Sequence, residues 1–96
     1  MLVLITYDVQ TTTKEGMRRL RQVAKQCVNF GQRVQNSVFE CQLEPEQFVK
    51  LRITLEKIIN PDTDSLRYYN LGKKWHSRVE HVGAKAGYDP EDTFIV

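Results

Sequence analysis

A single carboxylate, Asp8, stands at the end of the first apolar run of the chain. The run, residues 2–9, reads Leu-Val-Leu-Ile-Thr-Tyr-Asp-Val, which predicts a central strand covered on both faces. Because burying an unpaired charge is costly, Asp8 should lie where this strand leaves the core. Its oxygens would suit a hard cation such as Mg²⁺, although one carboxylate supplies too few ligands on its own.

Two interpretations of Asp8 are open. A two-fold axis near the strand would bring the Asp8 carboxylates of two copies together on one divalent ion. Such an ion can activate water and stabilise charge on a phosphodiester, which is nuclease chemistry. Alternatively, Asp8 accepts hydrogen bonds from the turn after the strand, which is a common role of aspartate.

The composition is that of an ordinary globular domain. The 96 residues are 41% hydrophobic and 27% charged, which fits one compact domain spanning residues 1–96. No apolar run approaches the roughly 20 residues of a membrane span, and the first run lacks the features of a signal peptide. We therefore expect a cytoplasmic protein without membrane contact. Cys27 and Cys41 fit no metal-ligand spacing and are expected to be free and buried.

Positive charge is concentrated in the first third of the chain. Residues 1–37 hold six Lys or Arg and two acids, a net charge of +4, against +2 for the whole chain. Arg18, Arg21 and Lys25 share one face of a predicted helix, with Arg19 beside them. This asymmetry is typical of an anion- or nucleic-acid-binding face, although helices also commonly carry a solvated charged side.

Helical periodicity and end signals predict the first helix over residues 13–30. Thr12 and Glu15 match a capping box at its start, and Gly31 is typical of a left-handed C-cap at its end. The apolar positions recur at helical spacing and predict the buried stripe, which consists of Met17, Leu20, Ala24, Cys27 and Val28.

The rest of the chain predicts four more strands and a second helix. Residues 33–43 alternate as a half-buried strand, with a bulge or twist near residues 36–37. Pro45 opens the second helix, whose apolar stripe ends at Ile58. The other strands lie over residues 65–71, 79–82 and 93–96, with a basic loop between the first two.

This order comes close to β-α-β-β-α-β with an extra C-terminal strand, and so predicts a ferredoxin-like α+β fold with both helices on one face of a mostly antiparallel sheet. The first strand is nevertheless apolar on both sides, and residues 93–96 would be an aggregation hazard if left unpaired. Both features are accounted for if two copies pack sheet to sheet and each terminal strand pairs with the partner subunit. We therefore expect a homodimer with exchanged C-terminal strands.

Three motifs resemble the CRISPR-associated protein 2 family, the small spacer-acquisition proteins of prokaryotic adaptive immunity. The first is the strand over residues 2–9 with its Tyr-Asp pair, which is unspecific alone. The second, Arg-Val-Gln-Asn-Ser-Val-Phe-Glu at residues 33–40, is highly specific at this distance from the first. The third is Asp-Ser-Leu-Arg-Tyr-Tyr at residues 64–69. The resemblance covers nearly the whole chain.

The resemblance implies a ferredoxin-like homodimer with metal-dependent nuclease activity on RNA or DNA. Asp8 matches the family's metal-binding acid, which holds one Mg²⁺, or another divalent ion such as Mn²⁺, shared across the dimer axis. Tyr7, Arg33 and Phe39 match positions that are implicated in the activity of some members.

The resemblance also implies a second role, in which the dimer bridges two dimers of the CRISPR-associated integrase on incoming DNA. A basic surface would then lie along duplex phosphates without reading bases. Arginines early in the first helix are implicated in the family's activity too, and Arg19 and Arg21 are the nearest matches. The predicted nucleic-acid-binding residues are Lys14, Arg18, Arg19, Arg21, Lys73, Lys74 and Arg78.

Three functions remain open at this point. They are a Mg²⁺-dependent endonuclease, a DNA-binding adaptor without catalysis, and a toxin-type ribonuclease or small-molecule sensor of similar fold. One acid per chain, with no second carboxylate nearby in the sequence and no evident general base, favours the adaptor as the main role. Nuclease activity would then be secondary, and the specific second-strand motif argues against the sensor.

Overall fold

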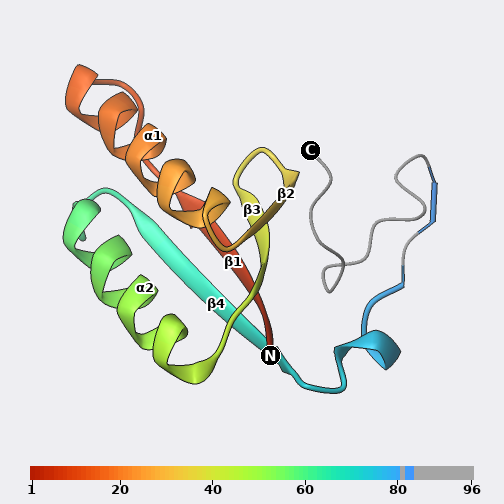
Figure 1. The fold of residues 1–96 in the computed structure, drawn as a ribbon. Helices are drawn as coiled ribbons and strands as arrows, with labels where there is room; N and C mark the ends of the chain where they lie inside the picture. The colour runs from red at the N-terminus through yellow and green to blue at the C-terminus, as the bar shows by residue number, and fades with distance from the viewer. Residues whose placement is uncertain (81, 84–96) are drawn as a thin grey trace.

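The computed structural model of the chain describes residues 1–80, 82 and 83. Its elements follow the order β-α-β-β-α-β, and a short 3₁₀ helix, η1, follows the last strand (Figure 1). This order confirms the predicted ferredoxin-like α+β fold. The elements are β1 (Leu2–Asp8), α1 (Lys14–Val28), β2 (Gly31–Gln35), β3 (Val38–Gln42), α2 (Pro45–Ile58), β4 (Ser65–Gly72) and η1 (Trp75–Ser77).

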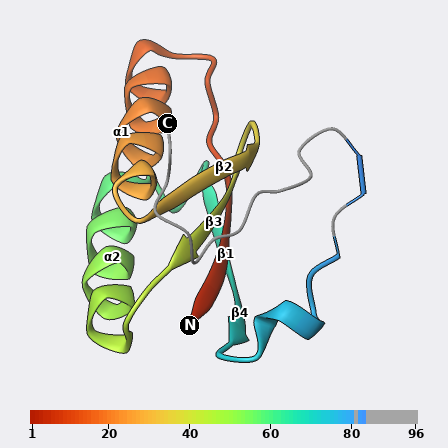
Figure 2. The ribbon, with the colours of Figure 1, turned by 45° about the vertical axis from the view of Figure 1, so that its right-hand side comes forward.

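The four strands form one antiparallel sheet in the order β2-β3-β1-β4, so β1 is paired on both edges. Both helices cover the same face, and η1 lies on the opposite side of the sheet (Figure 2). We call that opposite side the helix-free face, because neither α1 nor α2 covers it; it carries Leu4, Thr6 and Asp8 of β1. No helix in the described part of the chain is long and apolar enough to cross a membrane.

The hydrophobic core lies between the sheet and the two helices. Alternate residues of β1, namely Val3, Ile5 and Tyr7, point into it, because successive side chains of a strand face opposite sides. Leu2 and Trp75 are also buried but lie outside this cluster. The other buried members of the core are Val9, Val23, Cys27, Phe39, Cys41, Leu43, Leu51 and Leu55.

Both ends of α1 differ from their prediction. The N-cap is Thr13, whose Oγ1 accepts a hydrogen bond from the Gly16 N–H at 3.0 Å, so the predicted Thr12 cap is wrong. Gly31 is not a left-handed C-cap but the first residue of β2. A Cβ at this position would collide with the carbonyl oxygen of Glu40 on β3, so the glycine permits close pairing of the two strands.

The buried side of α1 is also rotated from its predicted position. Met17 and Val28 are half or more exposed, whereas Val23 is fully buried beside Cys27. The predicted stripe omitted Val23 because the apolar pattern alone does not locate the sheet against which the helix packs. Both cysteines are free and buried, as predicted.

The predicted long strand over residues 33–43 is in fact a hairpin. The chain reverses at Asn36 and Ser37, and the register between β2 and β3 shifts near Val34. Val34 and Val38 line a groove on the helix-free face, whereas Phe39 on the same strand as Val38 lies in the core. The opposite parities therefore belong to the two faces of the hairpin, and a turn replaces the bulge predicted near residues 36–37.

The short strand predicted over residues 79–82 is wrong, since Val79, Glu80 and Val82 lie outside any strand. Within the predicted basic loop, residues 75–77 form η1, which contains the buried Trp75. The terminal strand predicted over residues 93–96 lies outside the described residues.

A buried aspartate, Asp64, joins three parts of the fold. Its carboxylate accepts hydrogen bonds from Arg19 Nε on α1 at 2.8 Å and from the Gln10 N–H after β1 at 3.0 Å. It also accepts from the Asn60 N–H at 2.9 Å and the Thr63 hydroxyl at 3.0 Å in the loop before β4. These bonds fix the start of α1 against the loop that leads into β4.

The same contacts set the charge of Asp64. Burial raises its pKa, but the hydrogen bonds from Arg19, from the Asn60 and Gln10 backbone and from Thr63 outweigh burial and lower the pKa to about 2. An aspartate in an unfolded chain has a pKa of about 3.9. The ionised carboxylate therefore stabilises the fold above about pH 4, and this contribution is lost as the pH falls through about 2.

We predict that Asp64→Asn lowers the free energy of unfolding at pH 7 by about 2.5 kcal/mol, which corresponds to the lowered pKa. Below about pH 4 the difference from the unsubstituted chain should shrink, because the carboxyl of the unfolded chain is protonated there while the native carboxylate stays ionised down to about pH 2. Urea denaturation at equal chain concentration and several pH values measures both effects. The control is Asp62→Asn, an exposed acid in the same loop. Equal stability of the two variants at pH 7 would contradict the prediction.

Candidate active site on the helix-free face

Asp8 is the last residue of β1 and points to the helix-free face, opposite Ser65 on β4. Its side chain is exposed, and within the described residues its carboxylate has no hydrogen-bond or ion-pair partner. The turn after β1 donates its Gln10 N–H to Asp64 and not to Asp8. The interpretation of Asp8 as the acceptor for this turn therefore finds no support in the structure.

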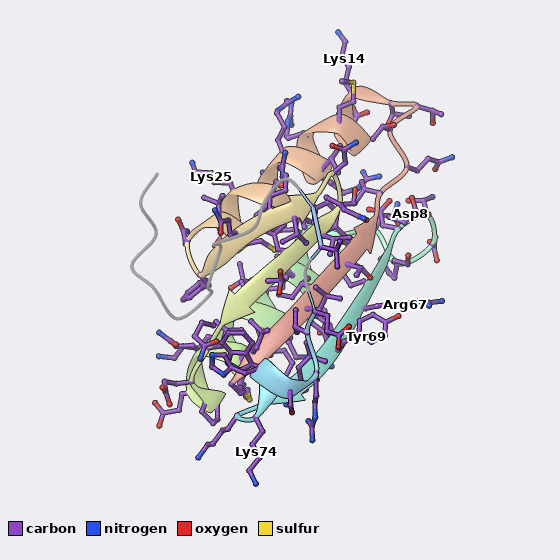
Figure 3. The ribbon with its side chains drawn as sticks, turned by 90° about the vertical axis from the view of Figure 1, so that its right-hand side faces the viewer. Asp8, Lys14, Lys25, Arg67, Tyr69 and Lys74 are labelled. Atoms are coloured by element: carbon purple, nitrogen blue, oxygen red, sulfur yellow. The ribbon has the colours of Figure 1, made fainter. Side chains whose placement is uncertain are left out.

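Asp8 opens onto a shallow pocket of about 290 Å³ between β1 and β4. We call it the Asp8 pocket; it is lined by Thr6, Tyr7, Asp8, Ser65, Arg67 and Tyr69. Figure 3 shows Asp8 at the end of β1, and Arg67 and Tyr69 further along the neighbouring strand. The pocket thus combines one acid with a guanidinium and a phenol, groups that can hold a cation and a phosphate.

Tyr7, Phe39 and Arg33 lie together on the other face of the sheet. The Tyr7 and Phe39 rings stack with centroids 6.2 Å apart, and the Arg33 guanidinium lies over the Phe39 ring at 5.2 Å. The Tyr7 hydroxyl donates to the Asn36 carbonyl at 3.4 Å. Burial raises the pKa of Tyr7, and the neighbouring Arg33 offsets part of this rise.

The four residues predicted to be catalytic are therefore divided between the two faces. Asp8 is exposed on the helix-free face, whereas Phe39 of β3 is completely buried in the core on the other face. In this arrangement Phe39 supports the end of β1 from behind and cannot itself reach a nucleic acid. Their catalytic roles remain predictions.

The predicted nucleic-acid-binding residues fall into separate groups. The basic helix face is the exposed row Lys14, Arg18, Arg21 and Lys25 on α1. Arg19 is outside this row because its guanidinium is ion-paired with buried Asp64 at 2.8 Å.

The second basic group surrounds η1. Lys73 and Lys74 are exposed, and Arg78 donates to the Leu71 carbonyl at 2.9 Å. Figure 3 shows Lys14 and Lys74 at opposite ends of the molecule, so the two groups do not form one compact patch.

The described residues contain no group of three or more His, Cys, Asp or Glu that could hold a metal ion. Asp8 fits the prediction of a shared ion, since its carboxylate is exposed and unpartnered within the described part of the chain. One chain contributes one hard oxygen donor of this kind, so two chains and water would be needed.

Arg67 and Tyr69 were absent from the predicted site, although both belong to the third motif, residues 64–69. Their alternation in an aromatic strand places them on one face, but the sequence does not reveal that β4 pairs with β1. Asp64 was overlooked for a similar reason, because its partners Gln10 and Arg19 are distant in the sequence.

The fold and the site define a small ferredoxin-like protein with one exposed acid at the end of its central strand. The family model described as CRISPR associated protein Cas2 matches residues 1–79. The chain therefore belongs to the CRISPR-associated protein Cas2 family, as the three motifs predicted.

Relatives and a solved structure agree with this assignment. The chain is 58% identical to the CRISPR-associated endoribonuclease Cas2 of Chlorobaculum tepidum, over all of both chains. It is 55% identical to the CRISPR-associated endonuclease Cas2 of Halalkalibacterium halodurans, over 99% of each. The crystal structure of Streptococcus pyogenes Cas2 is 58% identical, with a TM-score of 0.76 over 86% of this chain and 100% of that one.

We predict that Phe39→Ala lowers the free energy of unfolding by about 3–5 kcal/mol, because it removes a fully buried ring from the core. Arg33→Gln should change it by less than about 1 kcal/mol, since the Arg33 side chain is exposed. Urea denaturation followed by circular dichroism measures both. A Phe39→Ala variant as stable as Arg33→Gln would show that Phe39 is not needed for packing.

Proposed function

We propose that this protein is a homodimeric, metal-dependent endonuclease that hydrolyses phosphodiester bonds of RNA or DNA and acts in CRISPR spacer acquisition. The observation that carries the proposal is the exposed Asp8 carboxylate at the end of β1, which has no hydrogen-bond or ion-pair partner among the described residues. Relatives whose names include endoribonuclease and endonuclease support the reaction class. Their names differ in the substrate, so the proposal covers both nucleic acids.

The helix-free face supports a dimer of two such chains. A groove of about 670 Å³ on this face includes the apolar side chains of Leu4, Val34, Val38 and Leu71 in its lining. A second copy of the sheet would cover these residues and would remove apolar surface from water. A two-fold axis near β1 would then bring the two Asp8 carboxylates together.

Asp8 from each chain would hold one Mg²⁺ or Mn²⁺, with water completing the coordination. When bound, such an ion lowers the pKa of a coordinated water and offsets negative charge on the phosphodiester. The residues of the chain position this acid. Tyr7 and Phe39 pack behind the end of β1, and the Tyr7 N–H donates to the Ser37 carbonyl at 3.1 Å, which holds the strand end against the hairpin.

A second candidate function is an adaptor that bridges integrase dimers on double-stranded DNA without cutting it. The basic helix face favours this role, because four exposed cations on one side of α1 suit a row of phosphates. Phosphate contacts of this kind position a protein on a duplex without selecting a sequence. The two functions use different surfaces, so they can be separated by substitution.

We predict that Asp8→Asn abolishes metal-dependent cleavage, because an amide replaces the one acid among the described residues that line the Asp8 pocket. Isothermal titration calorimetry should detect one Mn²⁺ per two unsubstituted chains and no such binding by Asp8→Asn. The matched control is Asp62→Asn, which removes an exposed acid elsewhere. Unchanged cleavage by Asp8→Asn would disprove the nuclease proposal, and loss of spacer acquisition with intact DNA binding would argue against a purely structural role.

We further predict that Arg18→Ala with Arg21→Ala weakens duplex DNA binding by about tenfold or more. The slope of the logarithm of the binding constant against the logarithm of the salt concentration should become shallower by about two. Stability should be unaffected, since both side chains are exposed. Fluorescence anisotropy over a series of salt concentrations measures the effect. Lys50→Ala with Lys57→Ala on α2 is the control, and equal binding by the two double variants would place the duplex elsewhere.

A further inference from the structure

Arg67 and Tyr69 line the Asp8 pocket from β4, and the proposed function assigns neither side chain a role. In the register of β1 and β4, Arg67 is directly opposite Thr6, and Ser65 is directly opposite Asp8. Arg67 and Asp8 are therefore diagonal neighbours on the helix-free face, at a separation of roughly 7–8 Å for such pairs. We propose that Arg67 binds a phosphate oxygen of the nucleic-acid strand at the Asp8 site and that Tyr69 positions its guanidinium.

The charge of the pocket supports this assignment. A carboxylate repels an incoming phosphodiester, so the site needs positive charge close to Asp8 besides any cation that Asp8 holds. A guanidinium offers five N–H donors in a planar fork that matches phosphate oxygens. Arg67 supplies this group to the Asp8 pocket.

The donors of Arg67 are largely uncommitted within the described residues. The Arg67 side chain is exposed, and its Nη1 donates to the Tyr69 hydroxyl at 3.5 Å, the long limit of a hydrogen bond. No ion pair joins Arg67 to Asp8 in the described part of the chain. An acid and a guanidinium that are neighbours without being paired leave space between them for a ligand.

Other arginines of the sheet and of α2 are engaged elsewhere. Arg52 forms an ion pair with Glu56 at 3.3 Å and lies over the Tyr68 ring at 4.8 Å. Arg33 lies over Phe39 on the opposite face of the sheet. Arg67 is the arginine that lines the Asp8 pocket.

The inference rests on the proposed function, because it names a substrate-binding residue for the same site. It is tested with Arg67→Ala and with Arg52→Ala as the matched control. Binding of a short single-stranded oligonucleotide is measured by anisotropy in EDTA, and cleavage is measured with Mg²⁺. We expect Arg67→Ala to weaken metal-free binding about tenfold and to lower kcat/KM about 100-fold. The slope of the logarithm of the binding constant against the logarithm of the salt concentration should become shallower by about one.

Two further variants separate charge from geometry. Arg67→Lys keeps the charge but loses the fork, so it should restore most of the binding and little of kcat/KM. Tyr69→Phe keeps the ring but removes the hydroxyl that contacts Arg67, so it should lower kcat/KM a few-fold. When Tyr69→Phe is combined with Arg67→Ala, kcat/KM should fall no further than in Arg67→Ala alone, since Tyr69 acts through Arg67. A full additional loss in the double variant would overturn the positioning role of Tyr69.

The outcomes distinguish this inference from the proposed function. If Arg67→Ala binds and cleaves like Arg52→Ala while Asp8→Asn is inactive, the Arg67 inference is wrong and the nuclease proposal stands. If Asp8→Asn cleaves normally while Arg67→Ala loses metal-free binding, the nuclease proposal is wrong and the phosphate contact stands.

Discussion

Strand β1 is hydrogen-bonded on both edges, and the other elements are arranged around it. Its pairing with β3 on one side and β4 on the other places it inside the sheet, so its residues cannot rotate from one face to the other. Because a strand alternates, neighbours in sequence face opposite sides. Tyr7 therefore points into the core, and Asp8 lies exposed on the helix-free face.

The Asp64 carboxylate is the second constraint, and it acts on the ends of the elements. It accepts hydrogen bonds from the loop after β1, from α1 and from the loop before β4, so it fixes the region from which β1 and β4 present the Asp8 pocket. It also withdraws Arg19 from the basic helix face. One partly buried ion pair, between Arg19 and Asp64, thus decides both the local geometry and which arginines of α1 are available to a phosphate backbone.

The errors of sequence interpretation share one physical cause. The opposite parity of Val34 and Val38 to Phe39 fits a bulge in one strand or a hairpin equally well in the sequence, and only the pairing of β2 with β3 distinguishes them. Helix periodicity located the apolar side of α1 to within about one residue, but the sheet decided that Val23 is buried and Val28 is exposed. Where a local pattern is compatible with two packings, tertiary contacts make the choice.

The sequence alone determined the class of fold, the family and the exposed position of Asp8. These follow from local periodicity, from specific motifs and from the cost of burying an unpaired charge. The tertiary structure decided which residues are neighbours. It placed Phe39 and Arg33 behind β1, on the opposite face from Asp8, and brought Arg67 beside Asp8. The reason is that β4 and β1 are distant in sequence, and their register is set by packing and not by any local signal.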